Sequence, residues 1–154
     1  MQKDSYLHII FTCCFFLLCA CSPSFSPVMS ESDVGINDYE LIIAKEMDIL
    51  GAASDAIHAC FPDAVVSGVG GKEKGFVFNK ENFSDSPLYK LLIRKAYGTA
   101  ADGNDIVGYR YSIYVNGAFR SPEASDVQPL ITRFKKILAD RGIELIRVHL
   151  TKTR

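Results

Sequence analysis

The sequence predicts an α+β domain, a two-layer sandwich in which helices cover one side of an antiparallel or mixed sheet of 4–5 strands. Three observations predict it: one segment strictly alternates apolar and polar residues, three others repeat apolar residues at helical spacing, and turn residues separate them. The expected order is αββαβ(β)αβ, with about three helices and no internal repeat. We expect a single domain over residues 38–151.

The first helix is predicted over about Tyr39 to Cys60. Asn37 or Asp38 is a suitable N-cap, and Pro62 biases Phe61 away from helical angles. Six residues follow one stripe at helical spacing, namely Ile43, Met47, Leu50, Ser54, Ile57 and Phe61.

A β-hairpin and a second helix are expected next. Residues 64–69 and 75–79 are rich in Val and Phe and flank a glycine-containing turn, which predicts two paired strands. The second helix is predicted to begin at Ser86-Pro87, a hydroxyl cap followed by proline at the first helical position, and to end at Gly98. Its apolar stripe consists of Leu88, Leu91 and Leu92.

Residues 106–115 give the clearest strand signal, because apolar and polar side chains alternate throughout. Asn116-Gly117 predicts a type I′ turn, and residues 118–120 form a short return strand. Tyr and Arg are the residue types that anchor protein interfaces. We therefore predict that this strand binds a partner through Tyr109, Arg110, Tyr111 and Tyr114.

The last helix and strand follow. Ser125 and Gln128 have the spacing of a capping box, and Gly142 ends the helical pattern. The helix has a regular apolar stripe of Val127, Leu130, Ile131, Phe134, Ile137 and Leu138. Residues 143–150 are predicted as the final strand, with Ile146, Val148 and Leu150 on one face.

An apolar run from Tyr6 to Ala20 precedes the domain and ends in Leu18-Cys19-Ala20-Cys21. About fifteen apolar residues extend about 22 Å as a helix, less than the roughly 30 Å of a bilayer core, which favours cleavage over retention. The four-residue end resembles the lipobox of bacterial lipoproteins. The resemblance implies a signal peptide over residues 1–20, cleavage after Ala20 and lipid attachment to Cys21.

A lipid on Cys21 would hold the protein at a membrane through residues 21–37, a tether rich in Ser and Pro. Ser22 follows Cys21. A residue other than Asp at this position resembles the default signal by which Gram-negative lipoproteins are sorted to the outer membrane. We expect the periplasmic face of the cell outer membrane, with the inner membrane as the alternative. An ordinary secreted protein cut at Ala20, or an uncleaved anchor, is also compatible with the leader.

Composition excludes several function classes. Of the five cysteines, Cys60 alone would remain usable after cleavage and lipidation, so we expect no internal disulfide. The net charge of −1 gives no basic field for nucleic acid. His58 and Cys60 lie two residues apart and would face different sides of a helix. We predict no catalytic residues, no metal and no cofactor.

Three functional hypotheses follow. The first is a lipid-anchored periplasmic binding or accessory domain that acts through protein–protein interaction in the cell envelope. The second is an immunity lipoprotein that neutralises an antibacterial toxin delivered into the periplasm. The third, from the enzyme class, is a hydrolase of envelope polymers.

The lipid anchor yields the first testable prediction. Cys21→Ser should abolish labelling by radioactive palmitate and release the protein from membranes, because the thioether acceptor is lost. Retained labelling in Cys21→Ser would contradict the assignment, and Cys60→Ser serves as the control that keeps the label.

Overall fold

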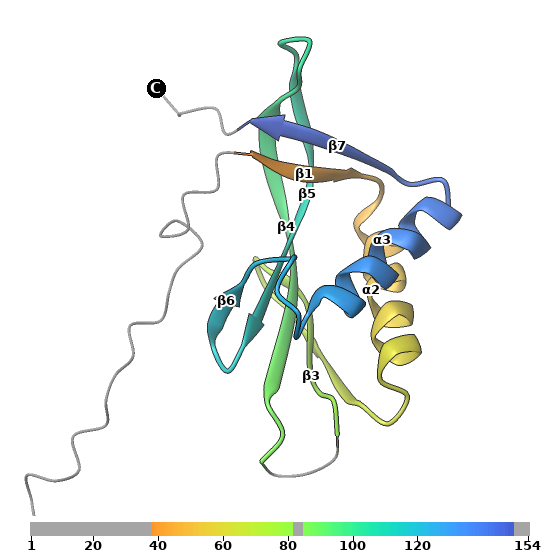
Figure 1. Ribbon diagram of the computed structural model, residues 1–154. Coiled ribbons are helices and arrows are strands. Elements are labelled where there is room, and N and C mark those ends of the chain that lie inside the picture. Colours follow the sequence, from red (N-terminus) through yellow and green to blue (C-terminus); the bar gives the residue numbers. More distant parts are fainter. Residues whose placement is uncertain (1–37, 82–84, 150–154) are drawn as a thin grey trace, which may run out of the picture.

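The computed structural model describes residues 38–81 and 85–149 (Figure 1). The described chain is an α+β fold, a seven-stranded antiparallel sheet with two helices. The predicted signal peptide, the predicted tether and Cys21 lie outside the described residues. The elements in chain order are β1 (Asp38–Ile43), α2 (Glu46–Cys60), β2 (Val65–Val69), β3 (Lys74–Asn79), β4 (Leu88–Thr99), β5 (Asp105–Val115), β6 (Ala118–Arg120), α3 (Gln128–Asp140) and β7 (Glu144–His149).

A long hairpin of β4 and β5 is the centre of the sheet. Its two strands stay in register from Tyr89 opposite Val115 to Thr99 opposite Asp105. The overall strand order is β2-β3-β4-β7-β1-β5-β6, with β4 and β5 paired in addition. Because β7 also pairs with β4, and β1 with β5, the strands β4, β5, β1 and β7 close into a ring. Figure 1 shows the β1–β7 ribbon crossing the hairpin.

Both helices lie on the same side of the β4–β5 hairpin, and the main core fills the space between (Figure 1). The hairpin contributes buried side chains from alternate positions, and Phe134 of α3 meets the Tyr111 ring edge-to-face at 5.7 Å. Each fully buried side chain of this size stabilises the fold by about 1.5–3 kcal/mol. The hairpin residues in this core are Tyr89, Leu91, Ile93, Tyr111, Ile113 and Val115.

Lys80 ties the sheet to the loop before α3. Its ammonium group lies 5.1 Å from the centre of the Phe61 ring and 4.6 Å from that of Tyr89. It also donates a hydrogen bond to the backbone carbonyl of Asp126 at 3.0 Å. Lys80 thus connects the residue after α2, the strand β4 and the loop before α3. Each cation–π contact of this kind contributes about 0.5–2 kcal/mol.

A second, smaller core lies under the β1–β7 ribbon, where Tyr39, Leu41 and Val148 are buried. Two glycines of the hairpin make this packing possible. A Cβ on Gly98 would lie 2.7 Å from the Cβ of Val148, and a Cβ on Gly108 would lie 2.9 Å from the backbone oxygen of Ile42. Both distances are below any normal contact, so the crossing requires glycine at these positions.

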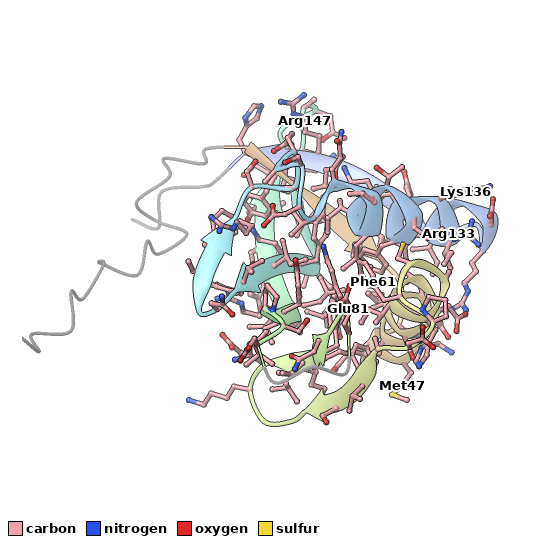
Figure 2. All side chains as sticks on the ribbon, turned by 60° about the horizontal axis from the view of Figure 1, so that its bottom comes forward. Met47, Phe61, Glu81, Arg133, Lys136 and Arg147 are labelled. Carbon is pink, nitrogen blue, oxygen red and sulfur yellow. The ribbon has the colours of Figure 1, made fainter. Side chains whose placement is uncertain are left out.

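The predicted first helix is wrong in its first part. Residues Asp38–Ile43 form β1, and the helix begins only at Glu46. The six residues of β1 pair in full with β7, which satisfies their backbone groups in an extended chain. The buried face of α2 is formed by Ile49, Ile57 and three alanines. Ile57 of the predicted stripe is therefore buried, whereas Met47 is 73% exposed and projects from the helix (Figure 2).

The predicted second helix is also wrong, because residues Leu88–Thr99 form the strand β4. Leu, Lys and Arg in this segment have good helix propensity, but pairing with both β3 and β5 overrides it. Gly98 is therefore no helix cap. It is the point where Val148 approaches the hairpin.

The remaining elements follow the sequence prediction closely. The hairpin of β2 and β3, the strand β5, the return strand β6 and the strand β7 are all present. Asn116 and Gly117 both have positive φ, as a type I′ turn requires. The last helix buries the predicted stripe, although its N-cap is Val127 and no side-chain cap forms, so the capping box is wrong. Over residues 38–81 and 85–149 the sheet has more than the expected 4–5 strands, and two helices are present where three were expected.

The crossing of the two ribbons gives a stability prediction. Gly98→Ala and Gly108→Ala should each lower the free energy of unfolding by about 1–3 kcal/mol, because the added methyl group overpacks the crossing. Chemical denaturation of each variant measures the change. Gly70→Ala is the control, since its Cβ would meet nothing within 4 Å. Equal stability of all three variants would contradict the steric argument.

Candidate functional site

A cleft opens where β1 and β5 part. Among the described residues these two strands pair at Ile42 opposite Tyr109, whereas β1 pairs with β7 over its whole length. Farther along, β5 pairs with β6 from Ile113 onward. The space between has a volume of about 380 Å³. Its lining residues are Tyr39, Glu40, Arg110, Tyr111, Ser112, Ile113, Phe119, Arg120, Ser121, Pro122, Glu123, Lys135 and Arg147.

The cleft collects charged side chains from elements that are distant in sequence. Its cations come from β5, β6, α3 and β7, and its two carboxylates are Glu40 on β1 and Glu123 in the loop after β6. Figure 2 shows Arg147 on β7, well away from Lys136 of α3. With more cations than carboxylates, the cleft attracts anionic groups. The cations are Arg110, Arg120, Lys135 and Arg147.

Tyr111 lies at the inner wall of the cleft, where its ring is buried and its hydroxyl faces Glu40. The hydroxyl donates a long hydrogen bond of 3.4 Å to Glu40 Oε2. Burial, and secondly the negative charge of Glu40, raise the pKa of Tyr111 well above its ordinary value. The phenol is therefore a neutral hydrogen-bonding group over the whole physiological range.

Two further contacts order the walls of the cleft. Lys135 Nζ lies 2.5 Å from Glu40 Oε2, which links α3 to β1. The guanidinium group of Arg110 lies 4.5 Å from the centre of the Tyr39 ring, and the Tyr39 hydroxyl donates to the backbone oxygen of Tyr97. These contacts hold the charged groups in defined positions before any ligand arrives.

Glu123 is held in its ionised form. The hydroxyl of Ser121 donates a hydrogen bond to Glu123 Oε2, and this bond is the main cause of a lowered pKa of Glu123. Glu123 is thus suited to accept hydrogen bonds or to pair with a cation.

The structure separates the four residues that sequence reasoning proposed for partner binding. Arg110 and Tyr111 line the cleft, whereas Tyr109 and Tyr114 are not among its lining residues. Tyr109 is partly buried against the main core. Tyr114 accepts a hydrogen bond of 2.8 Å from Arg94 and packs edge-to-face on Phe119 at 5.9 Å. Tyr111 is 8% exposed, so only its edge and hydroxyl are within reach of a ligand.

Sequence reasoning missed most of the charged residues in the cleft. Glu40 was expected on a helix, and Lys135 lies outside the apolar stripe predicted for the last helix. These side chains meet through the ring of strands β4, β5, β1 and β7, and no local pattern carries that information. The alternation of polar and apolar residues over positions 38–41 is the local signal for a strand in this segment.

The described residues outside the cleft offer little for chemistry. Burial raises the pKa of the Cys60 thiol, and the charge of Arg133 opposes this shift, so its reactive thiolate form is disfavoured. His58 Nδ1 contacts the backbone oxygen of Ser54 at 2.8 Å, on the preceding turn of α2. Over residues 38–81 and 85–149 no group of His, Cys, Asp and Glu is arranged to hold a metal ion. In the same ranges no helix combines the length and hydropathy needed to cross a bilayer.

The buried phenol gives a pH prediction. Tyrosine in the unfolded chain loses its proton near pH 10, whereas Tyr111 keeps it in the folded protein. The free energy of unfolding should therefore fall above pH 10, by up to about 1.4 kcal/mol per pH unit from this group. Tyr111→Phe should flatten that slope in denaturation curves, and Tyr97→Phe, at an exposed position, should not. Identical slopes in all three proteins would contradict the prediction.

Comparisons of the sequence and the fold with known proteins found no match. No family model matches the sequence, no curated protein is similar to it, and no solved structure matches the fold.

Proposed function

We propose that this protein is a lipid-anchored binding or accessory domain of the cell envelope and that it recognises another protein through the cleft between β1 and β5. The lipobox at Cys21 supports the anchor at the periplasmic face of the outer membrane, with the inner membrane as the alternative. The observation that carries the binding function is the set of cations over an aromatic wall in a cleft of about 380 Å³.

The ion pairs within the cleft are weak enough to be replaced reversibly by ion pairs with a partner. Lys135 and Arg120 are 35% and 44% exposed in their ion pairs with Glu40 and Asp126. Ion pairs at this exposure contribute about 0–1 kcal/mol each, so a partner carboxylate replaces the internal one at little cost. Tyr39, Tyr111 and Phe119 add apolar surface beside these charges. Arginine and aromatic side chains of this kind dominate the energy of protein interfaces.

The same geometry argues against the polymer hydrolase. Glycoside hydrolysis by a carboxylate pair needs one carboxyl group with a raised pKa to act as general acid. In the cleft, the pKa of Glu123 is lowered by Ser121, and Glu40 is paired with Lys135. The two carboxylates are arranged as acceptors and counter-ions.

Site-specific photo-cross-linking tests the binding function. A photoreactive amino acid at position 123, in the full chain and in intact cells, should give a discrete cross-linked species. Lys135→Glu should reduce that species about tenfold, because it opposes an anionic partner. Lys136→Glu is the matched control: it lies on the same helix but outside the cleft, where it pairs with Asp140.

Three outcomes of this experiment are informative. A species lost in Lys135→Glu and kept in Lys136→Glu supports the cleft as the binding site. No species at position 123, or equal loss in both variants, contradicts it. The partner's identity separates the two binding hypotheses, because an antibacterial toxin would favour an immunity lipoprotein and an envelope component would favour an accessory domain.

A further inference from the structure

The strand β2 is one end of the sheet, and no described strand pairs with its outer edge. β3 occupies the inner edge along the full length, from Val65 opposite Asn79 to Val69 opposite Gly75. Proteins usually protect such an edge with charge, proline or very short length. β6, the opposite end of the sheet, is three residues long and ends in Arg120 before Pro122. The β2 sequence Val-Val-Ser-Gly-Val has none of these protections.

Two glycines at this edge are required neither by a close contact nor by their backbone conformation within the described chain. A Cβ built on Gly68 or on Gly70 meets nothing within 4 Å, and neither residue has a positive φ. Glycine also weakens a strand by its backbone entropy. A glycine in a strand that its own fold does not need is typical of a place where another backbone approaches closely.

From this edge, we infer that β2 pairs antiparallel with β2 of a second copy of the chain, centred on Ser67. In that register Val65 faces Val69 of the second copy, and Val66 faces Gly68. The small residue opposite the large one leaves room on the face that carries Val66, the side toward the main core. On the other face the exposed Val65 gains an apolar neighbour.

The ends of β2 carry complementary charges. Asp63 precedes the strand and Lys72 follows it, so the antiparallel arrangement brings each acid near the lysine of the second copy. A parallel pairing would place like charges together. Self-complementarity of this kind is the requirement for a two-fold symmetric interface. β2 and the cleft involve different strands, so this inference does not rest on the proposed function.

Disulfide cross-linking of the full chain in native membranes tests the pairing. In a Cys60→Ala background, Ser67→Cys should form a dimer on oxidation, because directly opposed residues lie within disulfide range. Thr132→Cys, on the exposed side of α3, is the control, and its dimer yield should be about tenfold lower. Chains carrying Val65→Cys and Val69→Cys should cross-link to each other when co-expressed, and each should cross-link poorly to itself.

Gly68→Lys separates the interface from the fold. A Cβ at position 68 meets nothing within 4 Å in the described chain, so the melting temperature should change little, while the Ser67→Cys dimer should be lost because lysine at an exposed strand edge opposes pairing. The inference is overturned if Ser67→Cys reacts with a maleimide but gives no dimer. An adduct with the mass of another protein, or preferred self-cross-linking of Val65→Cys, overturns it equally.

Discussion

The structure depends on the close crossing of the β1–β7 ribbon over the β4–β5 hairpin. Gly98 and Gly108 allow the two layers of backbone to approach more closely than any side chain would permit. The crossing closes a ring of four strands and buries Tyr39, Leu41 and Val148 in a second core. It also directs β1 away from β5, and this divergence is what creates the cleft.

The crossing also places the cleft near the first and last described residues. Asp38 lies opposite His149 in the β1–β7 register, and Glu40 lies opposite Arg147, and both Glu40 and Arg147 line the cleft. A membrane tether ending at residue 37 would therefore join the domain beside its candidate binding site. A partner bound in the cleft would be held close to the same membrane surface, which raises its local concentration.

The cleft has a fixed shape, and the ion pairs within it are weak. Buried Tyr111 and the stacking of Arg110 on Tyr39 fix its shape, while its ion pairs are partly solvated and easily exchanged. Under the proposed function, such a site would bind and release charged partners with little rearrangement. Residues from β1, β5, β6, α3 and β7 meet in the cleft. Sequence reasoning identified Arg110 and Tyr111, which lie on one strand, but it could not identify the residues that the other elements contribute.

By itself, the sequence determined the elements whose signals are local. The alternation of residues 106–115, the Asn116-Gly117 turn and the apolar stripe of α3 each arise within one segment, so neighbouring residues suffice to predict them. Only the tertiary structure decided that residues 38–43 and 88–99 are strands. Residues 38–43 pair with β7, which lies more than 100 residues away in the sequence, and residues 88–99 pair with β3 on one edge and β5 on the other. Such pairing outweighs a helix propensity of less than about 1 kcal/mol per residue.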